Sequence, residues 1–350
     1  MNRHEPERDV SRRGFLKRGA QTAGALAAVG AGLDIFEQLA VAANEKNANP
    51  FPYDVGRLAK TDPKLVAYEE TARFKCPRGE AHRITRGADD QFLIAAGNYI
   101  SILSRDGALQ SEIALGGPAQ CVAVAKDGTI YAGARNHIEV FDAKGQRKAS
   151  WAPIEKRPWI TGLAVAEKDV FAADSGNRVV WRYDRDGKVA GRIGEKNKER
   201  NILGFVVPSP YLDVVLHRDG LIRVNNPGSH LVEAYTFDGD REQTWGRYSA
   251  AIDGFCGCCN PVALAVLPDG RIVTCEKGIP RVKVYANDGA FECVVAGAEA
   301  FPENVKSNEG GDALRGALDA TVDSRGRVCI LDPVSGTIRV MARKSETKGS

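Results

Sequence analysis

The feature that most constrains the fold is an internal repeat with a period of about 40–50 residues, which begins near residue 72. Each unit holds two apolar strands around a tight turn, a polar residue at the end of the second strand, a loop, and two further strands around another turn. Unit two shows the pattern most plainly, in the order Cys121–Ala125, Asp127-Gly128, Thr129–Gly133, Ile138–Phe141 and Lys144-Gly145. Units three and five repeat it, and looser copies occupy 82–115, 211–245 and 317–341.

Short strands of even spacing, joined in pairs by Asp-Gly and similar turns, are typical of the four-stranded blades of a β-propeller. Unit six ends near Arg343 with three strands, and Thr71–Cys76 supplies a strand just before unit one. That strand would close the ring and remove an exposed edge. The sequence therefore predicts an all-β, six-bladed β-propeller over 71–343, with a polar linker or arm at 44–70 and a disordered tail at 344–350.

Unit three contains Ala173–Val179, which reads Ala-Asp-Ser-Gly-Asn-Arg-Val and resembles the NHL repeat. Units five and six keep parts of the motif. The resemblance implies an NHL-like propeller in which an acidic residue at the end of each second strand braces the neighbouring loop, and in which arginines pair with that bracing. By this resemblance the bracing residues are Asp174, Arg178, Glu276, Arg281 and Asp332. We expect Trp159, Trp181 and Trp245 to pack between blades.

The N-terminus carries Ser11–Lys17, with Arg12 and Arg13 followed by Phe-Leu and a lysine, which resembles a twin-arginine export signal. An Ala- and Gly-rich run, Ala20–Leu33, follows, and Ala40–Ala43 offers an Ala-x-Ala cleavage site. The run is too short and too rich in alanine to span a bilayer. We therefore predict a signal peptide over 1–43 and a periplasmic or extracytoplasmic protein without stable membrane insertion. By resemblance, this route exports folded proteins, often with a cofactor.

The formal net charge is only +3, and basic and acidic residues nearly balance after residue 43. Such a balance indicates no nucleic-acid partner. We expect a protein or redox partner instead.

Three of the eight cysteines, Cys256, Cys258 and Cys259, fall within four residues, and Cys275 follows at the end of a predicted strand. Propeller topology places all four on one face, so they are candidate ligands for zinc or an iron–sulfur cluster. Two alternatives remain open at this point. Cys258 or Cys259 could pair with Cys275 as a structural disulfide, or the thiols could form a redox-active dithiol.

His137 and His230 lie in loops on the same predicted face, and we consider them candidate ligands or acid–base groups. The sequence predicts an exported binding or redox module whose cysteine-rich loop holds a metal or an iron–sulfur cluster. One alternative, which the NHL resemblance implies, is a lyase- or lactonase-like propeller enzyme with a funnel metal. Another is a protein-binding scaffold with structural disulfides. No phosphate loop, nucleophile elbow or His-Glu-x-x-His motif occurs.

Overall fold

The computed structural model describes residues 60–153, 157–309 and 316–345. The chain separates into two units, 1–54 and 55–350. The first unit contains the predicted export signal and lies outside the described residues. Within the described ranges, no helix is long and apolar enough to cross a membrane.

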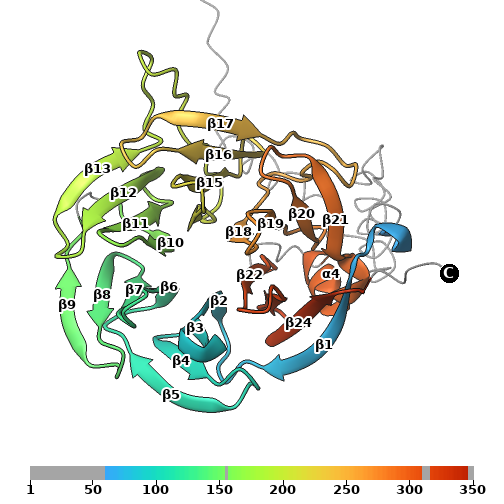
Figure 1. The fold of residues 1–350 in the computed structure, drawn as a ribbon, viewed down its shortest axis with the longest axis horizontal. Helices are drawn as coiled ribbons and strands as arrows, with labels where there is room; N and C mark the ends of the chain where they lie inside the picture. Colours follow the sequence, from blue (N-terminus) through green and yellow to red (C-terminus); the bar gives the residue numbers. More distant parts are fainter. Residues whose placement is uncertain (1–59, 154–156, 310–315, 346–350) are drawn as a thin grey trace, which may run out of the picture. The chain divides into compact units, whose positions relative to one another are not determined.

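Six antiparallel sheets of four strands each are arranged around a central axis (Figure 1). The first three blades are β2 (Ala81–Arg86), β3 (Phe92–Ala96), β4 (Tyr99–Leu103) and β5 (Leu109–Ala114); β6 (Ala119–Val124), β7 (Ile130–Ala134), β8 (His137–Phe141) and β9 (Arg147–Trp151); and β10 (Ile160–Val165), β11 (Asp169–Asp174), β12 (Val179–Asp184) and β13 (Val189–Ile193). Blade four holds β14 (Val214–Leu216), β15 (Ile222–Asn226), β16 (Leu231–Tyr235) and β17 (Arg241–Trp245). Blade five holds β18 (Ala263–Val266), β19 (Ile272–Cys275), β20 (Val282–Tyr285) and β21 (Phe291–Ala296). Blade six holds β22 (Asp319–Val322), β23 (Val328–Asp332), β24 (Thr337–Arg343) and β1 (Tyr68–Lys75). The predicted six-bladed propeller is confirmed.

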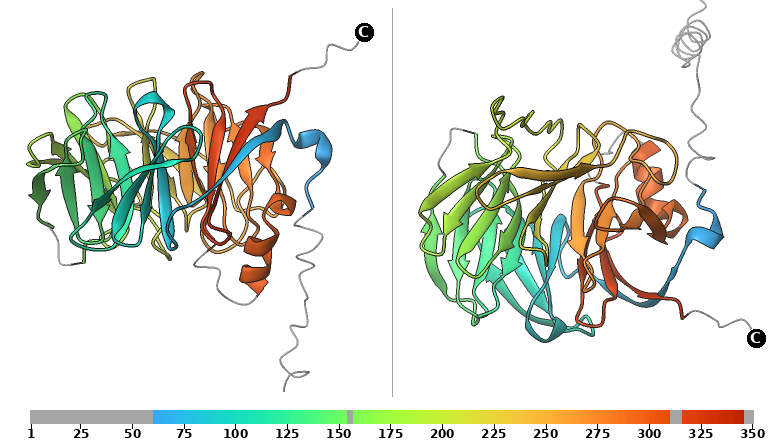
Figure 2. Two further views of the ribbon diagram at one scale, coloured as in Figure 1. Left: turned by 90° about the horizontal axis from the view of Figure 1, so that it is seen from below. Right: turned by 45° about the horizontal axis from the view of Figure 1, so that its top comes forward.

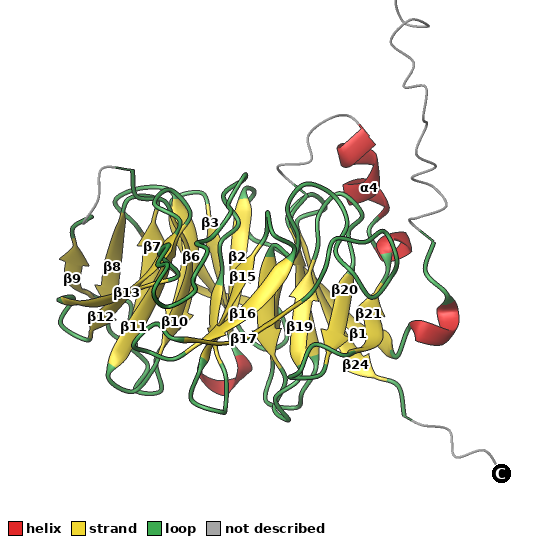
Figure 3. Cartoon of the chain, turned by 90° about the horizontal axis from the view of Figure 1, so that it is seen from above, coloured by secondary structure: helices red, strands yellow, loops and turns green. Residues whose placement is uncertain are grey.

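Helical segments are few and lie in connections. They are the short turns η1 (Pro63–Leu65), η2 (Ala88–Asp90) and η3 (Ala298–Ala300), and the helix α4 (Pro302–Glu309). Helix α4 stands out from one face of the ring, at the end where the inner strands begin (Figure 3).

The ring closes as expected, because β1 pairs antiparallel with β24 as the outer strand of blade six (Figure 2). The strand runs over Tyr68–Lys75 rather than Thr71–Cys76, with a register shift after Glu70. Val66, just before it, pairs with Val294 of β21, so this part of the predicted linker contacts blade five.

Burial follows the position of a strand in its blade. In blade one every residue of β3 is buried, whereas Ile113 is the one buried residue of the outer strand β5. Second strands such as β3 and β7 pack on both faces against neighbouring blades, which explains their nearly continuous apolar sequences. Each blade interface is filled by a cluster of buried apolar side chains. At about 1.5–3 kcal/mol for each large apolar side chain, this burial is the main stabilising contribution.

The turns between third and fourth strands contact the preceding blade through glycines with positive φ. A Cβ on Gly187 (φ +87°) would lie 2.4 Å from Trp151 Nε1, and one on Gly289 (φ +91°) would lie 2.4 Å from Trp245 Cγ. Trp151 and Trp245 each end the outer strand of the preceding blade. Glycine is therefore needed both for the turn and for the close contact with an aromatic ring.

We predict that Gly289→Ala lowers the free energy of unfolding by about 2–4 kcal/mol, because a left-handed backbone strain of about 1 kcal/mol adds to overpacking of about 1–3 kcal/mol. Gly220→Ala is the matched control, since Gly220 has φ +84° and no atom within 4 Å of its Cβ position. It should lose only about 1 kcal/mol. Urea unfolding monitored by tryptophan fluorescence measures both, and equal losses would contradict the contact with Trp245.

Candidate functional site: the central pocket and the cysteine loop

The central channel is crossed by the side chain of Arg83, which projects from the inner strand β2. Its Nε donates to the carbonyl of Thr161 (2.9 Å), and Nη1 lies 2.9 Å from Asp319 Oδ1 and 3.4 Å from Asp213 Oδ2. Nη2 donates to the carbonyl of Val262 at 3.3 Å. One buried guanidinium thus connects blades one, three and six with the segments that lead into blades four and five.

The two aspartates also fix the inner strands. Asp319 Oδ2 accepts from the backbone N–H of Ile84 (2.7 Å), and Asp213 Oδ2 accepts from Leu264 N–H (2.9 Å). Burial raises the pKa of Asp213 to about 6 and also raises the pKa of Asp319, while the charge of Arg83 opposes both shifts. The arginine therefore keeps two desolvated carboxylates in place.

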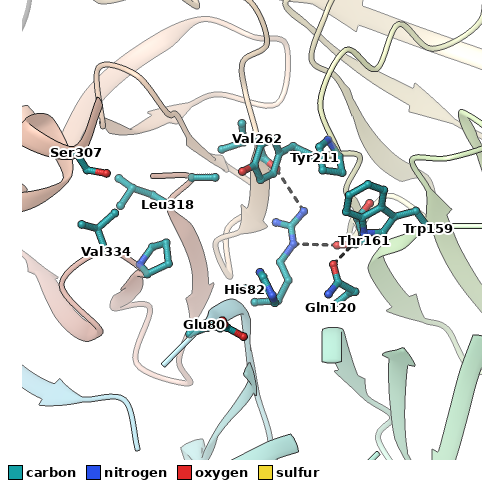
Figure 4. A pocket seen from close by; sticks show the side chains of 15 residues that line it. Glu80, His82, Gln120, Trp159, Thr161, Tyr211, Val262, Ser307, Leu318 and Val334 are labelled. Atoms are coloured by element: carbon teal, nitrogen blue, oxygen red, sulfur yellow. Dashed lines mark hydrogen bonds between the residues drawn. The ribbon is translucent and has the colours of Figure 1, made fainter. Parts of the chain in front are cut away.

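Arg83 separates two cavities in the channel. The larger has a volume of about 580 Å³ and opens on the face that bears α4; Figure 4 shows it. The smaller, of about 250 Å³, lies toward the opposite ends of the inner strands. The larger cavity is lined by polar, aromatic and apolar side chains, among them Glu80, His82, Gln120, Trp159, Tyr211, Val262, Leu318 and Val334.

Trp159 forms an aromatic wall of this pocket, and its position is fixed on three sides. Its Nε1 donates to Gln120 Oε1 (2.9 Å), its backbone N–H donates to Asp174 Oδ1 (2.9 Å), and the Arg135 guanidinium lies 4.2 Å from the ring centroid. From the start of blade three Trp159 contacts Gln120 and Arg135 of blade two, so it lies between blades as expected, and its ring also borders the cavity (Figure 4). Trp245 packs between blades as well, 4.9 Å from the ring of Tyr285.

His82 is the histidine of this pocket, and sequence reasoning missed it. Desolvation lowers the pKa of its imidazole, and the nearby charge of Glu80 acts in the opposite direction. His82 is nevertheless exposed at the mouth of the pocket, and a pKa below the ordinary value leaves its imidazole mostly neutral at pH 7. Its position in the sequence could have indicated this role. His82 stands beside Arg83 near the start of the first inner strand, and the inner strands begin at the face where the pocket opens.

The cysteine loop joins β17 to β18 and is held by several polar contacts. Asn260 Nδ2 donates to the carbonyls of Cys256 (2.5 Å) and Lys277 (3.0 Å), and its Oδ1 accepts from Lys277 N–H (2.9 Å). His230 Nε2 donates to the carbonyl of Gly257 at 2.8 Å. The loop is thus bound to the ends of blades four and five.

The loop brings together only two of the four predicted ligands. Cys258 is exposed and Cys259 is buried, and their sulfurs lie 3.1 Å apart. Cys275 lies in the apolar core between blades five and six, where burial raises the pKa of its thiol well above the ordinary value. Across the described residues, no group of three or more His, Cys, Asp or Glu could hold a metal ion.

All eight cysteines are described, and all are free thiols. The structure therefore contains neither the expected four-thiol arrangement nor a disulfide from Cys258 or Cys259 to Cys275. The physical reason is side-chain direction: successive side chains of a strand point to opposite faces, and Cys275 takes the face that packs into the core.

His137 and His230 do not line the central pocket. His137 Nε2 lies 3.0 Å from the buried carboxylate of Glu139, and Nδ1 contacts Asn136 Oδ1 at 2.8 Å. The ring of His230 contacts Tyr248 edge-on, with centroids 5.0 Å apart. His137 thus holds local structure on its own blade, whereas His230 binds the β17–β18 connection.

The contacts of the five bracing candidates differ in kind. Asp174 Oδ1 accepts from the backbone N–H groups of Trp159, Gly176 and Asn177, and Asp332 Oδ1 accepts from Val334 N–H and Asn304 Nδ2. Both carboxylates thus hold loops. Arg178 has φ +59°, and its backbone N–H donates to the carbonyl of Asp174.

Glu276 instead belongs to a buried ion cluster. It lies 2.8 Å from both Arg281 and Lys283, and Lys283 Nζ also donates to the carbonyls of Ile252 (3.0 Å) and Gly254 (2.7 Å). Desolvation lowers the pKa of Lys283 to about 8. This cluster holds the first half of the β17–β18 connection against blade five.

We predict that Arg83→Met lowers the free energy of unfolding by about 3–5 kcal/mol at pH 7, because two buried carboxylates lose their counter-charge. A carboxylate whose pKa is raised in the folded state destabilises the fold as the pH rises through that pKa. The loss of unfolding free energy caused by Arg83→Met should therefore be smaller at pH 5 than at pH 7. Urea unfolding at both pH values measures this.

Arg86→Met, on the same strand but at an exposed position, is the control and should change stability by less than about 1 kcal/mol. A loss for Arg83→Met that is identical at pH 5 and pH 7 would contradict the assigned role of the two aspartates.

The comparisons with known proteins concern the fold. No protein-family model and no curated protein sequence matches the chain, so the NHL resemblance stays a prediction. Solved structures do match: a streptogramin B lyase (TM-score 0.54, 13% identity, 79% of this chain and 98% of that one) and a catalytically inactive virginiamycin B lyase from Staphylococcus aureus with quinupristin (TM-score 0.50, 15% identity, 80% and 90%). A protein of unknown function from Bacteroides thetaiotaomicron also matches (TM-score 0.53, 17% identity, 79% and 72%). At these identities the chain shares with them the six-bladed propeller fold.

Proposed function

We propose that this protein is an exported binding module whose central pocket takes a small, ring-bearing organic molecule that is uncharged or cationic. The observation that carries the proposal is the cavity of about 580 Å³, closed at its base by Arg83 and walled by aromatic and apolar side chains. Small-molecule sites are of this size and composition, with few polar groups that fix orientation.

The charge of the pocket supports an uncharged or cationic ligand. Arg83 is already paired with two aspartates and two backbone carbonyls, so its positive charge is compensated. His82 is mostly neutral at pH 7, and Glu80 contributes a carboxylate. A phosphate or carboxylate ligand would meet no uncompensated cation among the described residues of the lining.

The side chains that wall the pocket favour a ligand that contains a ring. Trp159 and Tyr211 lie on one side of the cavity, and Val262, Leu318 and Val334 border it elsewhere (Figure 4). Aromatic side chains bury large areas and favour offset or edge-on contact with other rings. The amide of Gln120, beside Trp159, supplies a polar group for the edge of the ligand.

We predict that heterocycles without negative charge raise the melting temperature of the protein, since a ligand that binds only the folded state stabilises it. A thermal-shift screen of matched neutral, cationic and anionic ring compounds tests this. Titration followed by tryptophan fluorescence then gives the affinity. Trp159→Ala and His82→Ala should each weaken binding tenfold or more, which corresponds to about 1.4 kcal/mol.

Tyr248→Ala is the control for these variants, because Tyr248 is exposed and does not line the pocket. It should bind like the wild type. The proposal fails if anionic compounds bind preferentially, or if Trp159→Ala leaves the affinity unchanged.

A lyase acting on a ligand in the same pocket is the second candidate, favoured by the neutral imidazole of His82, which is in the form required of a general base. Incubation with quinupristin, followed by chromatography, tests one substrate class. If this candidate is correct, the compound is converted and His82→Gln slows conversion about 10²–10⁴-fold. Unchanged quinupristin with the wild type rejects this class.

A further inference from the structure

The adjacent residues Cys258 and Cys259 place an exposed thiol beside a buried one. Cys258 is exposed, whereas Cys259 is only 1% exposed, and 3.1 Å separates their Sγ atoms. An accessible thiol can meet a reagent from solution, and a shielded neighbour can react only with the first. Reacting atoms about 3–3.5 Å apart are in the range of productive attack.

Each sulfur also has a polar neighbour outside the pair. Ser209 Oγ lies 2.7 Å from Cys259 Sγ, and Lys277 Nζ lies 3.9 Å from Cys258 Sγ. Lys277 is buried, and its ammonium is 5.5 Å from the ring centroid of Tyr211. The hydrogen bond with Cys259 and burial raise the pKa of the Cys258 thiol, and the charge of Lys277 acts in the opposite direction, toward the reactive thiolate.

The pair lies near the central pocket, although neither cysteine lines it. Ser209, which contacts Cys259, immediately precedes Pro210 and Tyr211, and both of these line the cavity. The reactivity of the Cys258–Cys259 pair does not depend on which ligand the central pocket binds.

We propose that Cys258 and Cys259 form a thiol–disulfide exchange site that reacts with low-molecular-weight disulfides. The Cys258 thiolate attacks one sulfur of the disulfide RSSR, which forms a mixed disulfide and releases one thiolate RS⁻. Cys259, as its thiolate, then attacks Cys258 Sγ, which forms a Cys258–Cys259 disulfide and releases the second RS⁻. The two protein protons pass to the released thiolates, so two protein thiols and one RSSR become one protein disulfide and two RSH.

The product is reversible because of where the two residues stand in the chain. Adjacent Cα atoms are about 3.8 Å apart across a trans peptide, which is shorter than the usual Cα separation of a disulfide. Such a strained bridge is more easily reduced than a structural one, and labile disulfides of this kind are the catalytic or regulatory ones. This geometry therefore suits exchange and not permanent cross-linking.

Oxidised glutathione tests the proposal. The reduced full chain is incubated with it, free thiols are trapped with N-ethylmaleimide, and the cysteine-loop peptide is analysed by mass spectrometry. In the wild type, Cys258 and Cys259 should both escape alkylation without retaining glutathione, and dithiothreitol should restore both thiols. In Cys259→Ser, glutathione should stay on Cys258, and Cys258→Ser should show no adduct in the loop.

Cys256→Ser is the matched control, because Cys256 is in the same loop and is partly exposed. It should behave as the wild type. The proposal is overturned if wild-type protein keeps the glutathione adduct, or if Cys256→Ser abolishes the disulfide, which would make Cys256 the resolving thiol.

The Lys277→Met variant distinguishes the attack of Cys258 on glutathione disulfide from the later attack of Cys259 on the mixed disulfide. The first step should slow several-fold because the thiolate loses its cation, while release of glutathione from the mixed disulfide should keep its rate. A first step as fast as in the wild type would overturn the role assigned to Lys277. The melting temperature of each variant verifies that the propeller is folded.

Discussion

The Arg83 guanidinium, held between Asp213 and Asp319, is the interaction on which the centre of the molecule depends. Removing three charges from water is costly, and only good geometry with further hydrogen bonds compensates that cost. Here the aspartates accept backbone N–H groups as well as contacting the guanidinium, and the arginine donates to two carbonyls. The same contacts connect blades across the ring and close the base of the larger cavity. Fold and site therefore share one ion cluster.

The propeller architecture was predictable because it depends on short strands and turns that recur along the sequence. Turns such as Asp127-Gly128 recur at even spacing, and a missing fourth strand in unit six implied closure by an N-terminal segment. The exact start of β1 was not predictable, since pairing with β24 and the irregularity after Glu70 set it. Those are contacts between residues far apart in the chain.

The site was harder to predict, for the same reason. Arg83, Asp213 and Asp319 belong to three different blades, and no sequence spacing relates them. Topology correctly placed Cys258 and Cys259 in one loop, but it could not show that Cys275 turns into the core, because a shift of one residue in a strand reverses the face of every side chain. His82 was overlooked because it stands beside buried residues in an inner strand.

Pairing of β1 with β24 has a consequence for how the chain comes to be folded. The first strand of the propeller to leave the ribosome finds its partner only when Thr337–Arg343 has been synthesised, so the ring cannot close before that segment is available. Pairing over such a sequence separation makes a large loop-closure entropy part of the last folding step. Until then β1 lacks the strand with which it pairs, and an unpaired strand exposes the chain to aggregation and to chaperones.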